Sequence, residues 1–86
     1  MDRRLVRRRA RHDIIMQILK AAEGGRKKTQ IMQVAQLSFD QLEKYLHALN
    51  HAGFITEESG MWRTTEKGLH VIEACELCLR LTEEAK

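Results

Sequence analysis

The chain has 86 residues, of which 43% are hydrophobic and 31% charged, and its net charge is +3. This length suits one small domain, and no apolar run approaches the roughly 18 uncharged residues that cross a membrane. The N-terminal arginines have no apolar segment behind them, so we expect no secretory signal, a cytoplasmic protein and reduced thiols at Cys75 and Cys78.

Basic side chains concentrate at the start of the chain. Residues 1–28 carry ten basic and three acidic side chains, whereas residues 29–86 carry five basic and nine acidic ones. Residues 1–11 form an arginine-rich arm, either extended or continuous with the first helix. If the arm is helical, the spacing of three and four residues gathers on one side Arg3, Arg4, Arg7, Arg8 and Arg11. We predict that the arm binds a polyanion, of which nucleic acid is the commonest. The alternative is a solvated tail.

Two helices are expected next. Residues 13–22 have a broad apolar stripe at helical spacing, and Gly24 and Gly25 end it. The basic residues 26–28 lead into Thr29, which we expect to cap a second helix extending to Ala35, with Ile31, Val34 and Ala35 on one face.

A third helix follows after a sharp turn at residues 36–38. Ser38 and Gln41 have the spacing of a capping box, in which each side chain accepts from the other residue's backbone N–H. The third helix is expected to end at Gly53, because glycine tolerates the left-handed conformation after a helix. The inward stripe consists of Leu42, Tyr45, Leu46 and Leu49.

A short hairpin comes next, with arms at residues 54–57 and 61–64 and a tight turn at Ser59 and Gly60. Trp62 should anchor the second arm in the core or an interface. Residues 26–28 are expected to add a minimal third strand. Helix, sharp turn, helix and hairpin is the order of a winged helix-turn-helix, which predicts an α+β, mostly helical fold and nucleic-acid binding.

The last helix is expected to be capped by Thr65 and to extend from Glu66 to about Glu84. It is apolar on two sides, so it needs two partners. One stripe consists of Leu69, Ile72, Cys75 and Leu79, and the other of Val71, Ala74, Leu77, Cys78 and Leu81. We predict that the second stripe pairs with an identical helix in a homodimer. The alternative is a helix that lies across its own domain and buries both stripes. The expected organisation is a basic arm (1–11), a winged helix-turn-helix (12–65) and a dimerisation helix (66–86).

Four segments in order resemble a family of archaeal winged helix-turn-helix DNA-binding regulators: residues 11–19, 28–32, 37–46 and 64–68. The resemblance implies DNA binding as a dimer, with the third helix in the major groove and the hairpin wing beside it. Some relatives dimerise through a long C-terminal helix in an antiparallel coiled coil. The last helix here has only about twenty residues, so a compact dimer is expected.

The candidate DNA-binding residues are Arg3, Arg4, Arg7, Arg8, Arg11, Lys27, Lys28, Thr29, Ser38, Gln41, Lys44, His47 and Arg63. Gln41 could contact adenine with both amide atoms, and Lys44 could reach guanine or phosphate. Asp40 and Glu43 oppose this interpretation on the third helix, as Glu57 and Glu58 do on the wing. The alternative is a third helix that only faces solvent.

Other chemistry is weakly indicated. Cys75 and Cys78 form a CxxC in mid-helix, away from the helix N-terminus that activates such thiols, and His47 and His51 lie on a different helix. We therefore predict no metal and no cofactor. The sequence shows no phosphate-binding glycine loop, no catalytic set and no evident small-molecule site, so we expect no enzyme. Two other functions remain open: a protein–protein adaptor, and a chromatin-associated DNA binder that tolerates many sequences.

Overall fold

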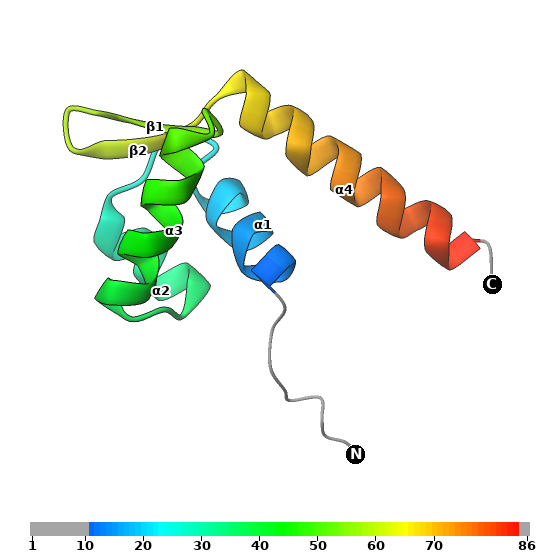
Figure 1. The fold of residues 1–86 in the computed structure, drawn as a ribbon, viewed down its shortest axis with the longest axis horizontal. Helices are drawn as coiled ribbons and strands as arrows, with labels where there is room; N and C mark the ends of the chain where they lie inside the picture. The colour runs from blue at the N-terminus through cyan, green and yellow to red at the C-terminus, as the bar shows by residue number, and fades with distance from the viewer. Residues whose placement is uncertain (1–10, 85–86) are drawn as a thin grey trace, which may run out of the picture.

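Figure 1 shows the computed structural model, which describes residues 11–84, with side chains as far as Leu77. The elements are α1 (Arg11–Ala21), α2 (Lys28–Ala35), α3 (Phe39–His51), β1 (Ile55–Glu58), β2 (Met61–Thr64) and α4 (Glu66–Glu84). The predicted order and class, three helices, a hairpin and a final helix, are confirmed. Residues 1–10 of the arginine arm lie outside the described residues. No helix in the described part of the chain is long and apolar enough to cross a membrane.

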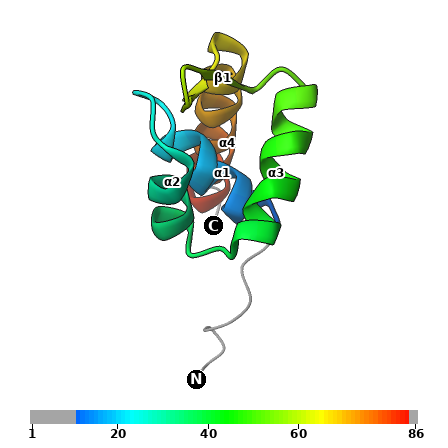
Figure 2. The same ribbon diagram turned by 90° about the vertical axis from the view of Figure 1, so that its left-hand side faces the viewer.

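The core lies where the first three helices meet, with α1 between α2 and α3 in the view of Figure 2. Its fully buried large side chains come from three helices and the first strand: Ile18, Leu19, Ile31, Leu42, Leu46 and Ile55. The predicted inward stripe of α3 is confirmed, with Tyr45 half-buried at its edge. On α2 the prediction was wrong for Val34, which is 49% exposed, whereas Ile31 and Ala35 are buried and Met32 packs against the core.

The helix starts differ in how well they were predicted. At α3, Gln41 N–H donates to Ser38 Oγ (3.2 Å) and Ser38 N–H donates to Gln41 Oε1 (3.0 Å), which confirms the capping box. At α2, Thr29 is not the cap. The cap position is two residues earlier, at Lys27, and the helix begins at Lys28; the N–H of Lys27 donates to Gln30 Oε1 (3.1 Å). The side-chain amide oxygen of Gln30 thus accepts from the backbone N–H of Lys27, which would lie outside the helix if Thr29 were the cap.

The hairpin is closed by a two-residue turn. Ser59 and Gly60 both have positive φ (53° and 81°), and Glu58 pairs with Met61 across them. This is the backbone twist that two antiparallel strands prefer. The first strand begins at Ile55, so Phe54 belongs to the preceding turn. The third strand expected at residues 26–28 is reduced to one bridge: Arg26 and Trp62 exchange two backbone hydrogen bonds (2.9 and 2.8 Å), whereas Lys28 already belongs to α2.

The start of α4 is attached to the end of α3. The hydroxyl of Thr65 accepts from Gly68 N–H (3.1 Å) and donates to the carbonyl of Gly53 (2.6 Å), which confirms the predicted cap. Gly53 has the expected positive φ of 86°. Lys67 donates to the carbonyl of Ala52 (2.9 Å) and lies over the Phe54 ring.

Only part of the apolar surface of α4 is covered. Ile72 is buried and Cys75 half-buried against α1, as one stripe predicts. Val71, assigned to the other stripe, also packs against the domain's own core. Leu69 (38%) and Leu77 (53%) are exposed. Figure 1 shows the second half of α4 extending past the other helices, so the helix does not lie across its own domain along its whole length.

Candidate nucleic-acid interface

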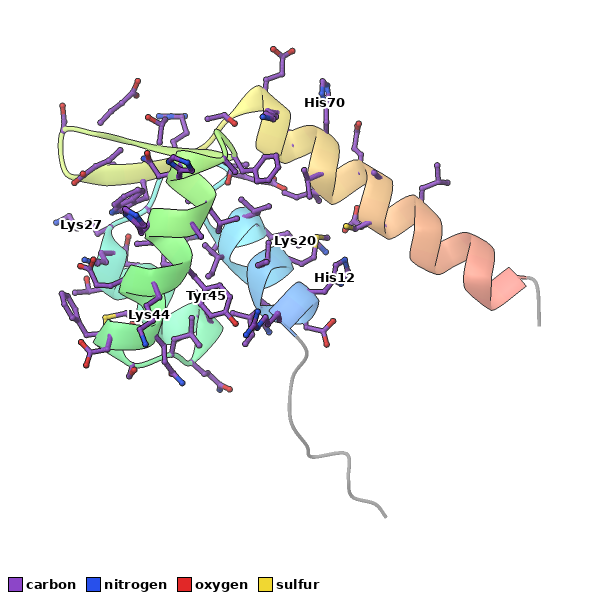
Figure 3. The ribbon with its side chains drawn as sticks, viewed as in Figure 1. His12, Lys20, Lys27, Lys44, Tyr45 and His70 are labelled. Atoms are coloured by element: carbon purple, nitrogen blue, oxygen red, sulfur yellow. The ribbon has the colours of Figure 1, made fainter. Side chains whose placement is uncertain are left out.

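The outward face of α3 carries polar and small side chains. Lys44, His47, Ala48 and His51 are exposed, while the leucines behind them are buried. Figure 3 shows Lys44 and Lys27 on the α2–α3 side of the molecule, away from α4. Because the capped helix is fixed by its buried stripe, these side chains project from a rigid element rather than from a loop.

Gln41 and Ser38 are already used by the capping box. The amide oxygen of Gln41 accepts from Ser38 N–H, so contact with adenine through both amide atoms would open the cap. Such a contact needs the oxygen as well as the amide NH₂. The prediction of bidentate adenine recognition by Gln41 is therefore incompatible with this helix start, and only its NH₂ group remains available.

Lys28 and Glu43 form an ion pair between α2 and α3. Lys28 also lies over the Phe39 ring, 4.3 Å from its centroid. Lys28 therefore joins the two helices instead of presenting an unpaired charge to phosphate. The same contact neutralises Glu43, one of the two carboxylates expected to repel DNA from α3.

The cations around this pair are more accessible. Arg26, Lys27 and Thr29 are exposed at the start of α2, and no ion pair of Arg26 or Lys27 occurs in the described part of the chain. On the wing, Arg63 is exposed and its Nε lies 3.9 Å from Glu58 Oε1, a weak surface pair. The wing thus presents a partly compensated charge, as its two glutamates predict.

Two hollows border α3. One, of about 220 Å³, lies between α3 and β2 and is lined by Glu43, Leu46, His47, Asn50, His51 and Trp62. The other, of about 350 Å³, lies between α1 and α3 and is lined by Arg11, Ile15, Lys44, Tyr45 and Ala48. The second brings together two predicted DNA-binding residues, Arg11 and Lys44. The other arginines predicted in the arm, Arg3, Arg4, Arg7 and Arg8, lie outside the described residues.

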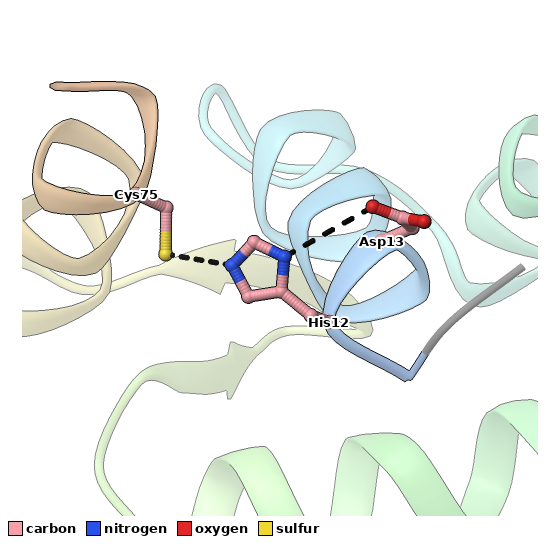
Figure 4. Close-up of polar contacts among 3 residues, drawn as sticks. All are labelled: His12, Asp13 and Cys75. Atoms are coloured by element: carbon pink, nitrogen blue, oxygen red, sulfur yellow. Dashed lines mark hydrogen bonds and ion pairs between the residues drawn. The ribbon is translucent and has the colours of Figure 1, made fainter. Parts of the chain in front are cut away.

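One contact escaped the sequence analysis. His12 Nε2 lies 3.0 Å from Cys75 Sγ, and its Nδ1 lies 4.0 Å from Asp13 Oδ1 (Figure 4). This contact and the Lys20–Glu76 ion pair (2.5 Å) attach α4 to α1. The residues are more than fifty positions apart, so no local pattern indicates them. Among the described residues, no group of three or more His, Cys, Asp and Glu side chains could hold a metal ion.

Comparison with known proteins agrees with this geometry. Residues 8–83 match the family model described as winged helix-turn-helix. The crystal structure of Sso10a-2, described as a DNA-binding protein from Sulfolobus solfataricus, superposes with a TM-score of 0.75 at 25% sequence identity, covering 90% of this chain and 85% of that one. A comparison with curated proteins finds no match.

Proposed function

This chain belongs to the winged helix-turn-helix family, and from that premise we propose that it is a duplex-DNA-binding, homodimeric transcriptional regulator. The resemblance to archaeal winged-helix regulators is confirmed by the family match and by the Sulfolobus neighbour. That neighbour is described as DNA-binding, which supports the same partner here.

The observation that carries the proposal is the distribution of paired and unpaired charge around α3. Glu43 is neutralised by Lys28, whereas Lys44 has no ion pair in the described residues. With α3 in the major groove, Lys44 would reach a guanine edge or a phosphate and His47 a phosphate. Lys27 and Thr29, exposed at the start of α2, would contact the backbone of the same duplex.

The arm and the wing would extend this surface. Because α1 begins at Arg11 on the same side as Lys44, a preceding arm with Arg3, Arg4, Arg7 and Arg8 would enter the neighbouring groove. Arg63 would approach the minor groove from the wing. Arginine in a narrow minor groove recognises shape more than base identity.

The homodimer is proposed on the exposed second half of α4. Leu77 is 53% exposed, and the second half of α4 extends past the other helices (Figure 1). A second copy of the helix would cover it, together with Ala74, Cys78 and Leu81, and Val71 would border that contact. Residues 66–86 would then act as the dimerisation element, and residues 12–65 as the DNA-binding unit.

Fluorescence anisotropy with a labelled duplex of about 25 base pairs at low salt tests DNA binding. Lys44→Ala, and separately the pair Arg7→Ala and Arg8→Ala, should weaken binding and lower the slope of log affinity against log salt by about 0.9 for each phosphate that is no longer neutralised. Lys20→Ala is the matched control, because it removes the same charge from a lysine paired with Glu76. Equal effects of Lys44→Ala and Lys20→Ala would contradict the assigned surface.

Sequence-tolerant binding is the second candidate, and the cap at Gln41 favours it because the cap withholds an amide from base recognition. Selection of preferred duplexes from a random pool distinguishes the two functions. A regulator should discriminate by about a thousandfold or more between its best site and random DNA. If the pool yields no preference, the chromatin-associated function holds. If no duplex is bound, the adaptor function remains.

Sedimentation equilibrium tests the dimer. We expect a mass above the 10.0 kDa of one chain at about 50 µM, and a monomer for Leu77→Asp. Glu73→Gln, an exposed change one turn earlier on α4, should leave the assembly intact. A wild-type chain that stays monomeric at this concentration would remove the dimer from the proposal.

A further inference from the structure

The hollow between α1 and α3 has the dimensions of a small-molecule site. Its volume is about 350 Å³, within the range of roughly 300–1,000 Å³ typical of ligand sites. The sequence indicated no such site, because the residues that form it come from two helices about thirty positions apart. In Figure 3, Tyr45 is directed from α3 toward the start of α1, and it is one of the residues that line the hollow.

The floor of the hollow is apolar. Ile15 and the ring of Tyr45 are half-buried, and Ala48 is too small to fill the space in front of them. A flat hydrocarbon body would cover these groups and remove them from water, whereas a bare inorganic anion would leave them uncovered. The free energy gained by burying apolar surface therefore favours a ligand with a hydrocarbon body over a simple ion.

The polar groups at the rim are cationic or hydrogen-bond donating, and they are unused. Arg11 and Lys44 have no ion pair, and the hydroxyl of Tyr45 no hydrogen bond, among the described residues. Elsewhere in the described chain Lys20 and Lys28 are matched with glutamates. None of the described residues that line the hollow carries a carboxylate. Two unpaired cations above an apolar floor select an anionic head joined to an apolar body.

We propose that this hollow binds a small carboxylic acid with an aromatic-sized apolar body. The carboxylate lies between the Arg11 guanidinium and the Lys44 ammonium group, the Tyr45 hydroxyl donates to it, and the body covers Ile15 and Ala48. Arg11 supplies a planar donor set that matches a carboxylate.

Occupancy has a consequence for DNA, and this step rests on the proposed function. The ligand takes the Lys44 charge that would contact phosphate and adds a negative charge beside the outward face of α3. Ligand and duplex therefore compete, and the acid acts as an effector that releases DNA. Binding of the acid to the DNA-free chain is independent of that step.

Isothermal titration calorimetry on the full chain, with naphthoate as the probe and neutral naphthamide as its isostere, tests the site. Naphthoate should bind with a dissociation constant of about 1 mM or tighter, which is ordinary for a ligand of its size, and naphthamide at least about fivefold more weakly. Lys44→Gln should weaken naphthoate binding about fivefold or more, and Ala48→Phe should abolish it by filling the hollow. Lys27→Gln, an equal charge change at another unpaired lysine, should leave it unchanged.

Several results would overturn the proposal. Equal weakening by Lys44→Gln and Lys27→Gln would show general charge attraction, and equal binding of naphthamide would show that the cations have no role. Displacement of naphthoate by an equal concentration of inorganic phosphate would exclude an apolar acid as the ligand class. Affinity that falls as the chain self-associates would show that a second copy occupies the hollow.

The DNA step is measured separately. In the wild type, naphthoate should lower the apparent affinity for the duplex in proportion to the fraction of protein that remains free of naphthoate. It should have no effect on the duplex affinity of Ala48→Phe. If naphthoate binds as expected but DNA affinity does not change, the coupling is wrong and the site stands. If no duplex is bound at all, the proposed function fails, and calorimetry still decides the ligand site.

Discussion

The two halves of α4 are made of similar residues but have different surroundings. The first half is held by the Thr65 cap, by Ile72 in the core and by the contacts of Cys75 and Glu76 with α1. The second half begins at the exposed Leu77 and extends past the body (Figure 1). Helical periodicity treats both halves alike, so an apolar stripe shows that a helix needs a partner but does not show which one.

Ile72→Ala should have the largest effect, because it removes a buried side chain from the attached half. We expect a loss of about 3 kcal/mol in the free energy of unfolding, from reduced burial and the cavity that remains. Urea unfolding followed by circular dichroism measures it. Ile72→Val should cost about 1 kcal/mol. A loss below about 1 kcal/mol for alanine would mean that α4 is not anchored at this position.

Gly68→Ala should also destabilise, although alanine is the better helix former by about 1 kcal/mol. A Cβ at this position would overlap the carbonyl oxygen of Phe54 and lie 2.6 Å from Thr64 Cγ2. Because Phe54 is held there by the N–H of Thr65, we expect a net loss of about 2 kcal/mol in urea unfolding. Gly24→Ala, with open space around it, is the control. A stabilised Gly68→Ala variant would contradict the close approach of α4 to the hairpin.

Thr65→Val should cost about 1.5 kcal/mol of unfolding free energy. The change keeps the shape but removes the helix cap and the hydrogen bond to the carbonyl of Gly53. Thr65→Ser retains the hydroxyl and should recover most of the loss. Thermal unfolding of the wild type, Thr65→Ser and Thr65→Val should give midpoints that fall in that order. Equal midpoints for the valine and serine variants would disprove the prediction.

Leu77→Gln should change the unfolding free energy of the monomer least, by about 0.5 kcal/mol or less, because the side chain is already exposed. The measurement belongs at concentrations where the chain does not self-associate. Its contrast with Ile72→Ala, five positions earlier on the same helix, is the sharpest test of the division of α4. A loss of about 2 kcal/mol at Leu77 would show that the second half is attached after all.

The features that could be predicted from the sequence are those whose cause is local. Ser38 and Gln41 are three residues apart, and one turn of helix brings their side chains to each other's backbone. Gly53, Ser59 and Gly60 adopt the positive φ that a helix stop and a two-residue turn require. The stripe of α3 follows from periodicity alone. Each of these depends on a few consecutive residues.

The features that could not be predicted depend on how helices meet. Nothing near Glu43 in the chain indicates that Lys28 neutralises it, so the sequence overstates its repulsion of DNA. Gln41 suits base recognition by its residue type, but a cap and a base contact use the same amide. The hollow at Tyr45 is lined by side chains from both α1 and α3. A pairing or a cavity between elements is a property of their packing, which local patterns do not encode.

The attachment of α4 to α1 also sets how late in synthesis the fold can be completed. His12 and Cys75 are separated by 63 positions, so the contact between them cannot form until the intervening chain has been made. At 5–20 residues per second, the residues between the hairpin and Glu76 take roughly 1–2 s to add. Until Cys75 and Glu76 reach α1, the flank of α1 that α4 covers stays exposed. That flank is where a cotranslational chaperone would find apolar surface.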